Sequence, residues 1–71
     1  MEHVIVRYSE TRAVLVDGVE SGTIGDILRL EQGTHTFSLG GPQDYKPSSQ
    51  TLMVKDTTPI KPMEVTFVKI S

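Results

Sequence analysis

The chain has 71 residues, of which 7 are basic and 9 are acidic, and it contains no cysteine. This length predicts a single domain with a small core, because so short a chain buries only about 60% of the surface that its unfolded form exposes. The lack of cysteine excludes a disulfide framework and a thiolate zinc site. The formal net charge of −2 and the scattered basic residues predict no nucleic-acid partner.

Hydropathy along the chain predicts no membrane insertion, since no apolar run approaches the roughly 18–20 residues that a spanning helix needs. The N-terminal stretch MEHVIVRYSE lacks the basic and then apolar layout of a signal peptide. We therefore expect a cytoplasmic protein if the chain is complete as written. If it was excised from a longer exported protein, we expect a location in the cell envelope.

Short segments of alternating apolar and polar residues follow one another along the chain, separated by turn residues. They predict strands at His3–Tyr8, Ala13–Val16, Val19–Gly22, Asp26–Glu31, Thr34–Leu39, Gln50–Lys55 and Glu64–Ile70. Only Ile24–Leu30 is ambiguous between helix and strand. About seven short strands at this spacing predict an all-β fold, a single antiparallel β-sandwich over residues 1–71.

Two connections between these strands carry clear turn chemistry. Asp17-Gly18 suits the positive φ angles of a tight hairpin. Gly40–Ser49 is the longest expected loop, and Tyr45 is its only large apolar side chain.

The last predicted strand is apolar on both faces. Val65 and Phe67 share one face, and Val68 and Ile70 share the other. This pattern predicts either a bulge that switches the register or cover on both faces. The cover would come from the fold itself, from a neighbouring domain or from a second copy in a weak homodimer.

The stretch VLVDGVESGTIGDILRLEQGTHTFSLGGPQDYKPSSQTLMV resembles a PEGA domain, a small bacterial β-sandwich module. The resemblance covers about residues 12–70. It rests on Asp17-Gly18, Gly22-Thr23, Leu28, Leu30, Gly33-x-His35-x-Phe37-x-Leu39 and Tyr45-x-Pro47. Thr23-Ile24, Gln32-Gly33 and Asp44 depart from the family pattern, and carboxypeptidase-regulatory-like and Cna-B-like domains share the same strand rhythm. The resemblance implies an accessory module of larger bacterial proteins, with no catalytic residues.

His35 is the first candidate for chemistry. It shares a strand face with Phe37 and Leu39, so we expect a neutral imidazole, inward or at the rim of the core, that donates one N–H to a backbone carbonyl. We assign it a structural role, as we do Gly33, Asp17 and Gly18 in the neighbouring turns. The alternative is a metal ligand or base, but the only other histidine, His3, is not placed near it, and we predict no metal site.

The remaining polar residues predict no catalytic group and no cofactor. The serines lie in turns or on a polar strand face, outside any nucleophile-elbow context. Asp17, Glu20 and Asp26 lie near hairpin turns, where carboxylates serve turns or face solvent. We therefore expect that the protein is not an enzyme.

Two segments are candidates for binding. In the long loop, Tyr45 could stack on a sugar while Gln43, Asp44 and Lys46 supply hydrogen bonds; alternatively, Tyr45 folds back and caps the core. The N-terminal strand carries no proline, unlike the segment with Pro59 and Pro62.

That strand therefore predicts an open edge for a protein partner at Val4, Ile5, Val6 and Arg7. The leading hypothesis is a non-catalytic interaction or spacer module that contacts another protein or an adjacent domain. The alternative is a module that binds a carbohydrate or cell-envelope ligand through the Tyr45 loop.

Overall fold

The computed structural model describes residues 1–70, which form β-strands and connecting loops without a helix. The prediction of a small all-β domain is therefore confirmed. The nine strands are β1 (Glu2–Arg7), β2 (Ala13–Val16), β3 (Val19–Thr23), β4 (Ile27–Leu30), β5 (Gly33–Leu39), β6 (Tyr45–Lys46), β7 (Gln50–Val54), β8 (Met63–Thr66) and β9 (Val68–Lys69). None of the described residues could belong to a membrane-spanning helix.

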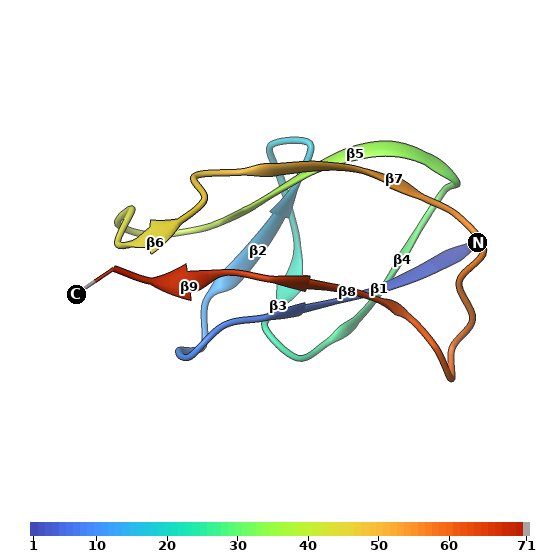
Figure 1. The fold of residues 1–71 in the computed structure, drawn as a ribbon, viewed down its shortest axis with the longest axis horizontal. Helices are drawn as coiled ribbons and strands as arrows, with labels where there is room; N and C mark the ends of the chain where they lie inside the picture. Colours follow the sequence, from blue (N-terminus) through green and yellow to red (C-terminus); the bar gives the residue numbers. More distant parts are fainter. Residues whose placement is uncertain (71) are drawn as a thin grey trace.

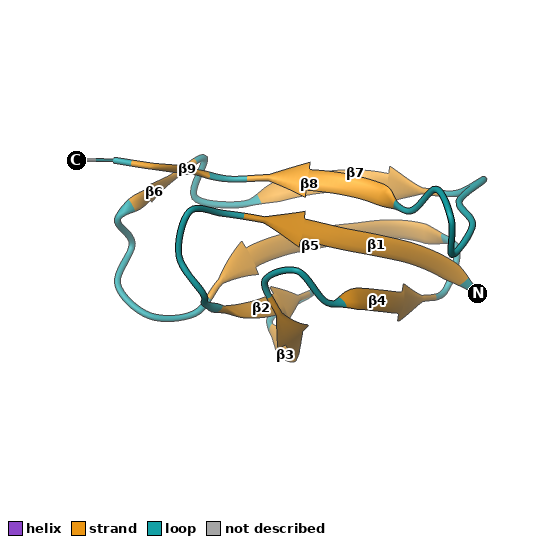
Figure 2. Ribbon diagram, turned by 90° about the horizontal axis from the view of Figure 1, so that it is seen from below, coloured by secondary structure: helices purple, strands orange, loops and turns teal. Residues whose placement is uncertain are grey.

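The strands form two main sheets that pack face to face (Figures 1 and 2). One sheet has three strands in the order β4-β1-β8, and the other has four in the order β3-β2-β5-β7. The short strands β6 and β9 pair with each other at one end of the molecule. The molecule is elongated, with extents of 34 × 20 × 16 Å.

One strand pairing is parallel, which the sequence did not predict. β8 runs in the same direction as β1, with Val4 opposite Met63 and Arg7 opposite Thr66, while the other pairings are antiparallel. The reason is that the connection after β7 crosses from the four-stranded sheet to the three-stranded one before β8 begins. The sandwich is therefore mixed rather than antiparallel throughout.

The predicted strand over Glu64–Ile70 is two strands with different partners. β8 pairs with β1, whereas β9 pairs with β6 in the long loop. Val65 and Phe67 are buried, at 1% and 2% exposed, but Val68 and Ile70 are about half exposed. The second apolar face is therefore uncovered, and the strand changes its partner at Phe67.

The core consists of alternate side chains from the two facing sheets, together with one tyrosine from the long loop. Most of them are β-branched or aromatic, which suits the pleated surface of a sheet. The buried cluster comprises Val4, Val6, Val14, Val16, Leu28, Phe37, Leu39, Tyr45, Val54, Val65 and Phe67.

Candidate functional site

The N-terminal strand lies at the centre of its sheet and is not an open edge. β4 pairs with one side of β1 and β8 with the other. Val4, Ile5 and Val6 are at most 8% exposed, and the exposed Arg7 donates from Nε to Oε1 of Glu64 at 2.7 Å. The predicted partner edge at Val4–Arg7 is therefore wrong, because β8 returns alongside β1 and occupies its free side.

Tyr45, the candidate for sugar stacking, is buried at 4% exposed. Its hydroxyl donates to the carbonyl oxygen of Leu39 at 2.9 Å and accepts from the Leu39 N–H at 3.2 Å. Its ring packs edge-on against Phe67 and Tyr8, with ring centroids 5.4 and 6.1 Å apart. Of the two interpretations of Tyr45, this packing supports the core one, and the ring is not accessible to a ligand in this conformation.

The long loop is held by Arg12. Nη1 of Arg12 donates to the carbonyl oxygens of Gly40 and Pro42, and Nη2 donates to both carboxylate oxygens of Asp44 at 2.7 and 2.8 Å. The guanidinium also lies over the Tyr8 ring, 5.6 Å from its centroid. The hydrogen bond from Arg12 lowers the pKa of Asp44 below its ordinary value. Arg12 therefore links three positions of the loop to the segment that precedes β2.

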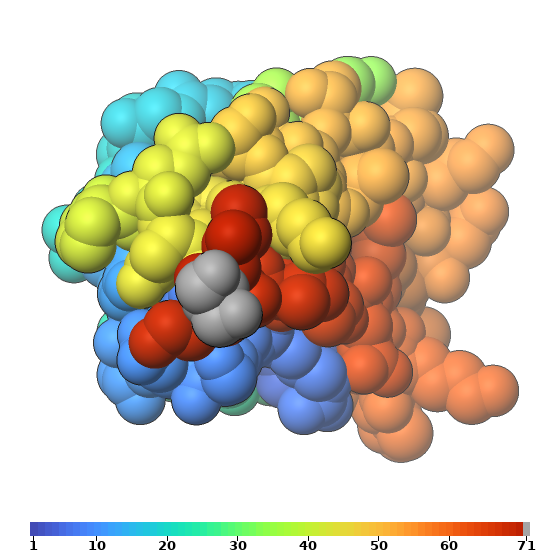
Figure 3. All heavy atoms as spheres, turned by 60° about the vertical axis from the view of Figure 1, so that its left-hand side comes forward, coloured from blue at the N-terminus to red at the C-terminus, as the bar shows by residue number. Residues whose placement is uncertain are grey.

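The C-terminal segment packs on to the same end of the molecule, where three parts of the chain meet (Figure 3). Lys69 donates to Glu10, and the Ile70 N–H donates to the Asp44 carbonyl oxygen at 2.7 Å. Of the four predicted ligand residues, Asp44 and Tyr45 are thus engaged within the fold. Gln43 and Lys46 are exposed.

His35 lies between two hydrogen-bond acceptors. Nδ1 is 2.8 Å from Oδ2 of Asp17, and Nε2 is 2.7 Å from the carbonyl oxygen of Glu31. Both nitrogens can donate only when the ring is an imidazolium. The hydrogen bond to Asp17 and then that to Glu31 raise the pKa of His35 above its ordinary value. The predicted hydrogen bond to a backbone carbonyl is therefore present, at Glu31, whereas the raised pKa favours a charged ring over the neutral one that the sequence predicted.

The His35 ring connects two turns to strand β5 through these two contacts. Asp17 and Gly18 have φ angles of 53° and 81°, as the tight β2–β3 turn requires. Oδ1 of Asp17 accepts from the Thr36 N–H at 2.9 Å. This bond, followed by the one from His35, lowers the pKa of Asp17. Gly33, where β5 begins, has a φ of 143°, in a region that favours glycine.

No metal centre or cavity is present within residues 1–70. No three acidic or histidine side chains there could together hold a metal ion, and no pocket opens in this part of the chain. His3 and His35 belong to different sheets. Nδ1 of His3 is buried without a hydrogen-bond partner among these residues.

The edges of the two main sheets remain as candidate interaction surfaces, and three of these four edges carry features that hinder further pairing. β7 and β8 are connected by a hydrogen bond of 2.8 Å from Nε2 of Gln50 to the Thr66 carbonyl oxygen, and Pro62 precedes β8. β3 is irregular, because its register against β2 shifts between Val14 and Leu15. Bulges and prolines are the usual means by which edges resist further pairing.

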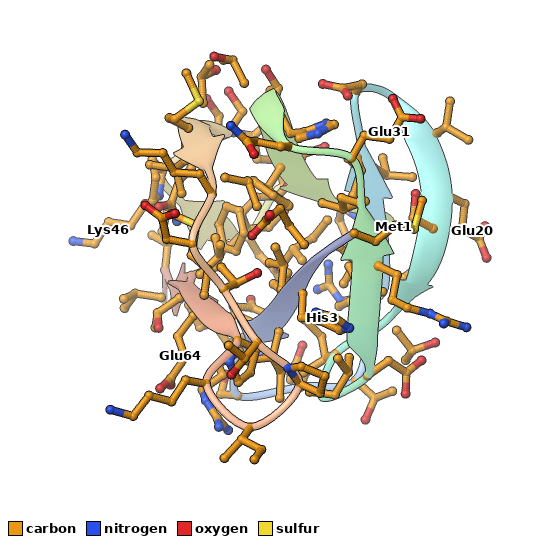
Figure 4. All side chains as sticks on the ribbon, turned by 90° about the vertical axis from the view of Figure 1, so that its right-hand side faces the viewer. Met1, His3, Glu20, Glu31, Lys46 and Glu64 are labelled. Carbon is orange, nitrogen blue, oxygen red and sulfur yellow. The ribbon has the colours of Figure 1, made fainter. Side chains whose placement is uncertain are left out.

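β4 is the edge that lacks such protection. It pairs with β1 alone, in a regular antiparallel register from Leu30 opposite Glu2 to Ile27 opposite Ile5. Leu28 points inward and is 5% exposed, whereas Ile27 is 46% exposed on the outer face. Figure 4 views the molecule with β4 in the foreground and β3 beside it.

A glycine permits this arrangement of β3 and β4. A Cβ added to Gly22 would lie 2.5 Å from Cδ2 of Leu28, so any larger residue there would have to displace the Leu28 side chain. The sequence predicted the strand at Asp26–Glu31 but not its place at an edge. The alternation of Ile27 and Arg29 with the buried Leu28 indicates a strand with one face in solvent. The ambiguity between helix and strand over Ile24–Leu30 made this pattern hard to recognise.

Comparison of the chain with protein-family models, with curated proteins and with solved structures finds no match. The resemblance to PEGA domains therefore stays a prediction.

Proposed function

We propose that this chain is a non-catalytic interaction module, PEGA-like in character, which binds an extended segment of another protein or of an adjacent domain. The observation that carries the proposal is the unpaired edge of β4, over Ile27–Leu30. In an antiparallel sheet, alternate backbone N–H and C=O groups of an edge strand face away from its single partner. An added strand satisfies these groups, and main-chain hydrogen bonds then supply the affinity.

The alternative, glycan binding through the long loop, has less support. Gln43 and Lys46 are exposed and could donate hydrogen bonds, but the Tyr45 ring is buried. Stacking on a sugar would require that ring to leave the core. Binding at this loop is therefore the competing outcome when peptide contacts are mapped by NMR.

The test is a selection of random linear decapeptides against the immobilised protein, followed by amide NMR mapping of the enriched peptides. We expect shifts in β4 and in its neighbour β1. Ile27→Lys places a charge on the edge strand and should abolish the enrichment. Met53→Lys is the matched control, because Met53 is similarly exposed at 54% but lies on β7, in the other sheet. Shifts confined to Gln43–Lys46, or no enriched peptide at all, would contradict the proposal.

A further inference from the structure

The outer face of β4 has a defined chemistry where a partner strand would lie. Ile27 is half exposed and lies opposite Ile5 of β1, so the two form an apolar pair on that face. Arg29 is exposed on the same face, opposite His3. The strand thus presents an apolar position and a basic position two residues apart.

Arg29 has no ion-pair partner within residues 1–70. The carboxylates near β4 are mostly engaged elsewhere: Oδ2 of Asp26 accepts from the Thr23 N–H, and Oε1 of Glu2 accepts from Thr57. Glu31 is exposed, follows Arg29 by two residues and forms no salt bridge with it. Figure 4 shows Glu20, the acidic residue of β3, projecting outward from its own strand.

We infer that the segment bound along β4 carries an acidic residue opposite Arg29 and an apolar residue opposite Ile27. This inference rests on the proposed function and specifies the partner of that same edge. Directly opposite residues of an antiparallel pair have Cβ atoms about 4.5–5.5 Å apart, so opposite charges there attract and like charges repel. Antiparallel addition is the arrangement expected, because it is the more stable per residue.

The inner positions of the added strand follow from the same register. Residues opposite Leu28 and Leu30 would face the rim of the core, because Leu28 is buried and Leu30 packs partly against the core cluster. Read antiparallel, the bound segment therefore has the order apolar, acidic, apolar, apolar. A partner with a basic residue at the second position would meet Arg29 with a like charge.

The test compares two capped peptides, TVEVVT and TVKVVT, by amide NMR titration of the labelled chain. We expect the acidic peptide to bind β4 at least threefold more tightly, with the preference decreasing as salt is added. Arg29→Glu should reverse the preference, and Arg29→Gln should remove it. Lys55→Glu changes an exposed basic residue beyond the end of β7 and should leave the preference unchanged.

The outcomes separate the inference from the proposed function. If both peptides shift β4 equally, edge binding stands and the role of Arg29 is overturned. If neither peptide moves β4 amides at the highest soluble concentration, both are overturned. If the acidic peptide instead shifts residues of β7 or of the long loop, the assignment to Arg29 is wrong.

Discussion

The hydroxyl of Tyr45 takes the place of a missing strand beside Leu39. β7 begins at Gln50, opposite Phe37, so that it does not reach Leu39. The Gly40 N–H bonds to the Ala13 carbonyl oxygen on the other side of β5, and because bonding alternates along a strand, the polar groups of Leu39 point away from β2. There they meet the Tyr45 hydroxyl as donor and acceptor.

Tyr45→Phe removes this hydroxyl and keeps the ring in the core. A buried backbone group left unpaired costs about 1–3 kcal/mol, and two groups are affected here, so we expect a loss of about 2 kcal/mol or more. A domain of this length has a free energy of unfolding of roughly 4–10 kcal/mol. The variant should therefore fold, but with a substantially lower stability.

The assay is urea unfolding followed by far-ultraviolet circular dichroism. With a slope of about 1 kcal/mol/M for so small a protein, the midpoint should fall by about 2 M while the slope stays constant. Tyr8→Phe is the matched control: its hydroxyl lies 3.2 Å from Oδ1 of Asp44 at a half-buried site, where water can replace it. Equal midpoints for the two variants would refute the reasoning.

The stability of the fold should decrease as the pH rises through the folded-state pKa of His35. That pKa lies above the ordinary value of 6.5, so the stabilisation is complete below the unfolded-state pKa and is lost above the folded one. Gly22→Ala forces a methyl group against Leu28 and should cost about 1–3 kcal/mol in chemical unfolding. Arg12→Lys replaces a fork by a single ammonium, so the thermal midpoint should fall and the amide of Asp44 should exchange faster.

Each of these predictions has a contradicting result. A His35 titration midpoint at or below 6.5 by NMR would contradict a stabilising imidazolium. So would a pH dependence of stability that persists unchanged in His35→Gln. For Gly22, the double variant with Leu28→Val should lose less than the two single losses combined, and simple additivity would contradict the clash. For Arg12, the control is Arg7→Lys, which alters an exposed ion pair. An equal fall in the thermal midpoint for both variants would contradict a special role of Arg12.

The alternation of apolar and polar residues predicted the strands well, because the two-residue period of a strand involves only neighbours in the sequence. Ala13–Val16 coincides with β2, and Thr34–Leu39 differs from β5 by one residue. Pairing between strands depends on contacts between distant parts of the chain, and the alternation does not encode it. The position of β1 at the centre of its sheet depends on β8, which lies more than fifty residues later.

The candidate site was predictable to the same extent. The place of His35 on the face of Phe37 follows from alternation, but its raised pKa depends first on Asp17, which is 18 residues away in the sequence. Likewise, capping of the core by Tyr45 was one of two interpretations, and only the backbone of Leu39 decides between them. The edge of β4 is open because no later strand returns to it.

The parallel pairing of β1 and β8 also determines how the domain responds to force. β1 starts at one end of the long axis, and the segment that contains β8 and β9 finishes at the other (Figure 1). Tension applied between these two ends slides β1 and β8 past each other and loads their hydrogen bonds together, in shear. A hairpin pulled from its open end breaks one bond at a time. Along this axis the domain should therefore extend little before it yields.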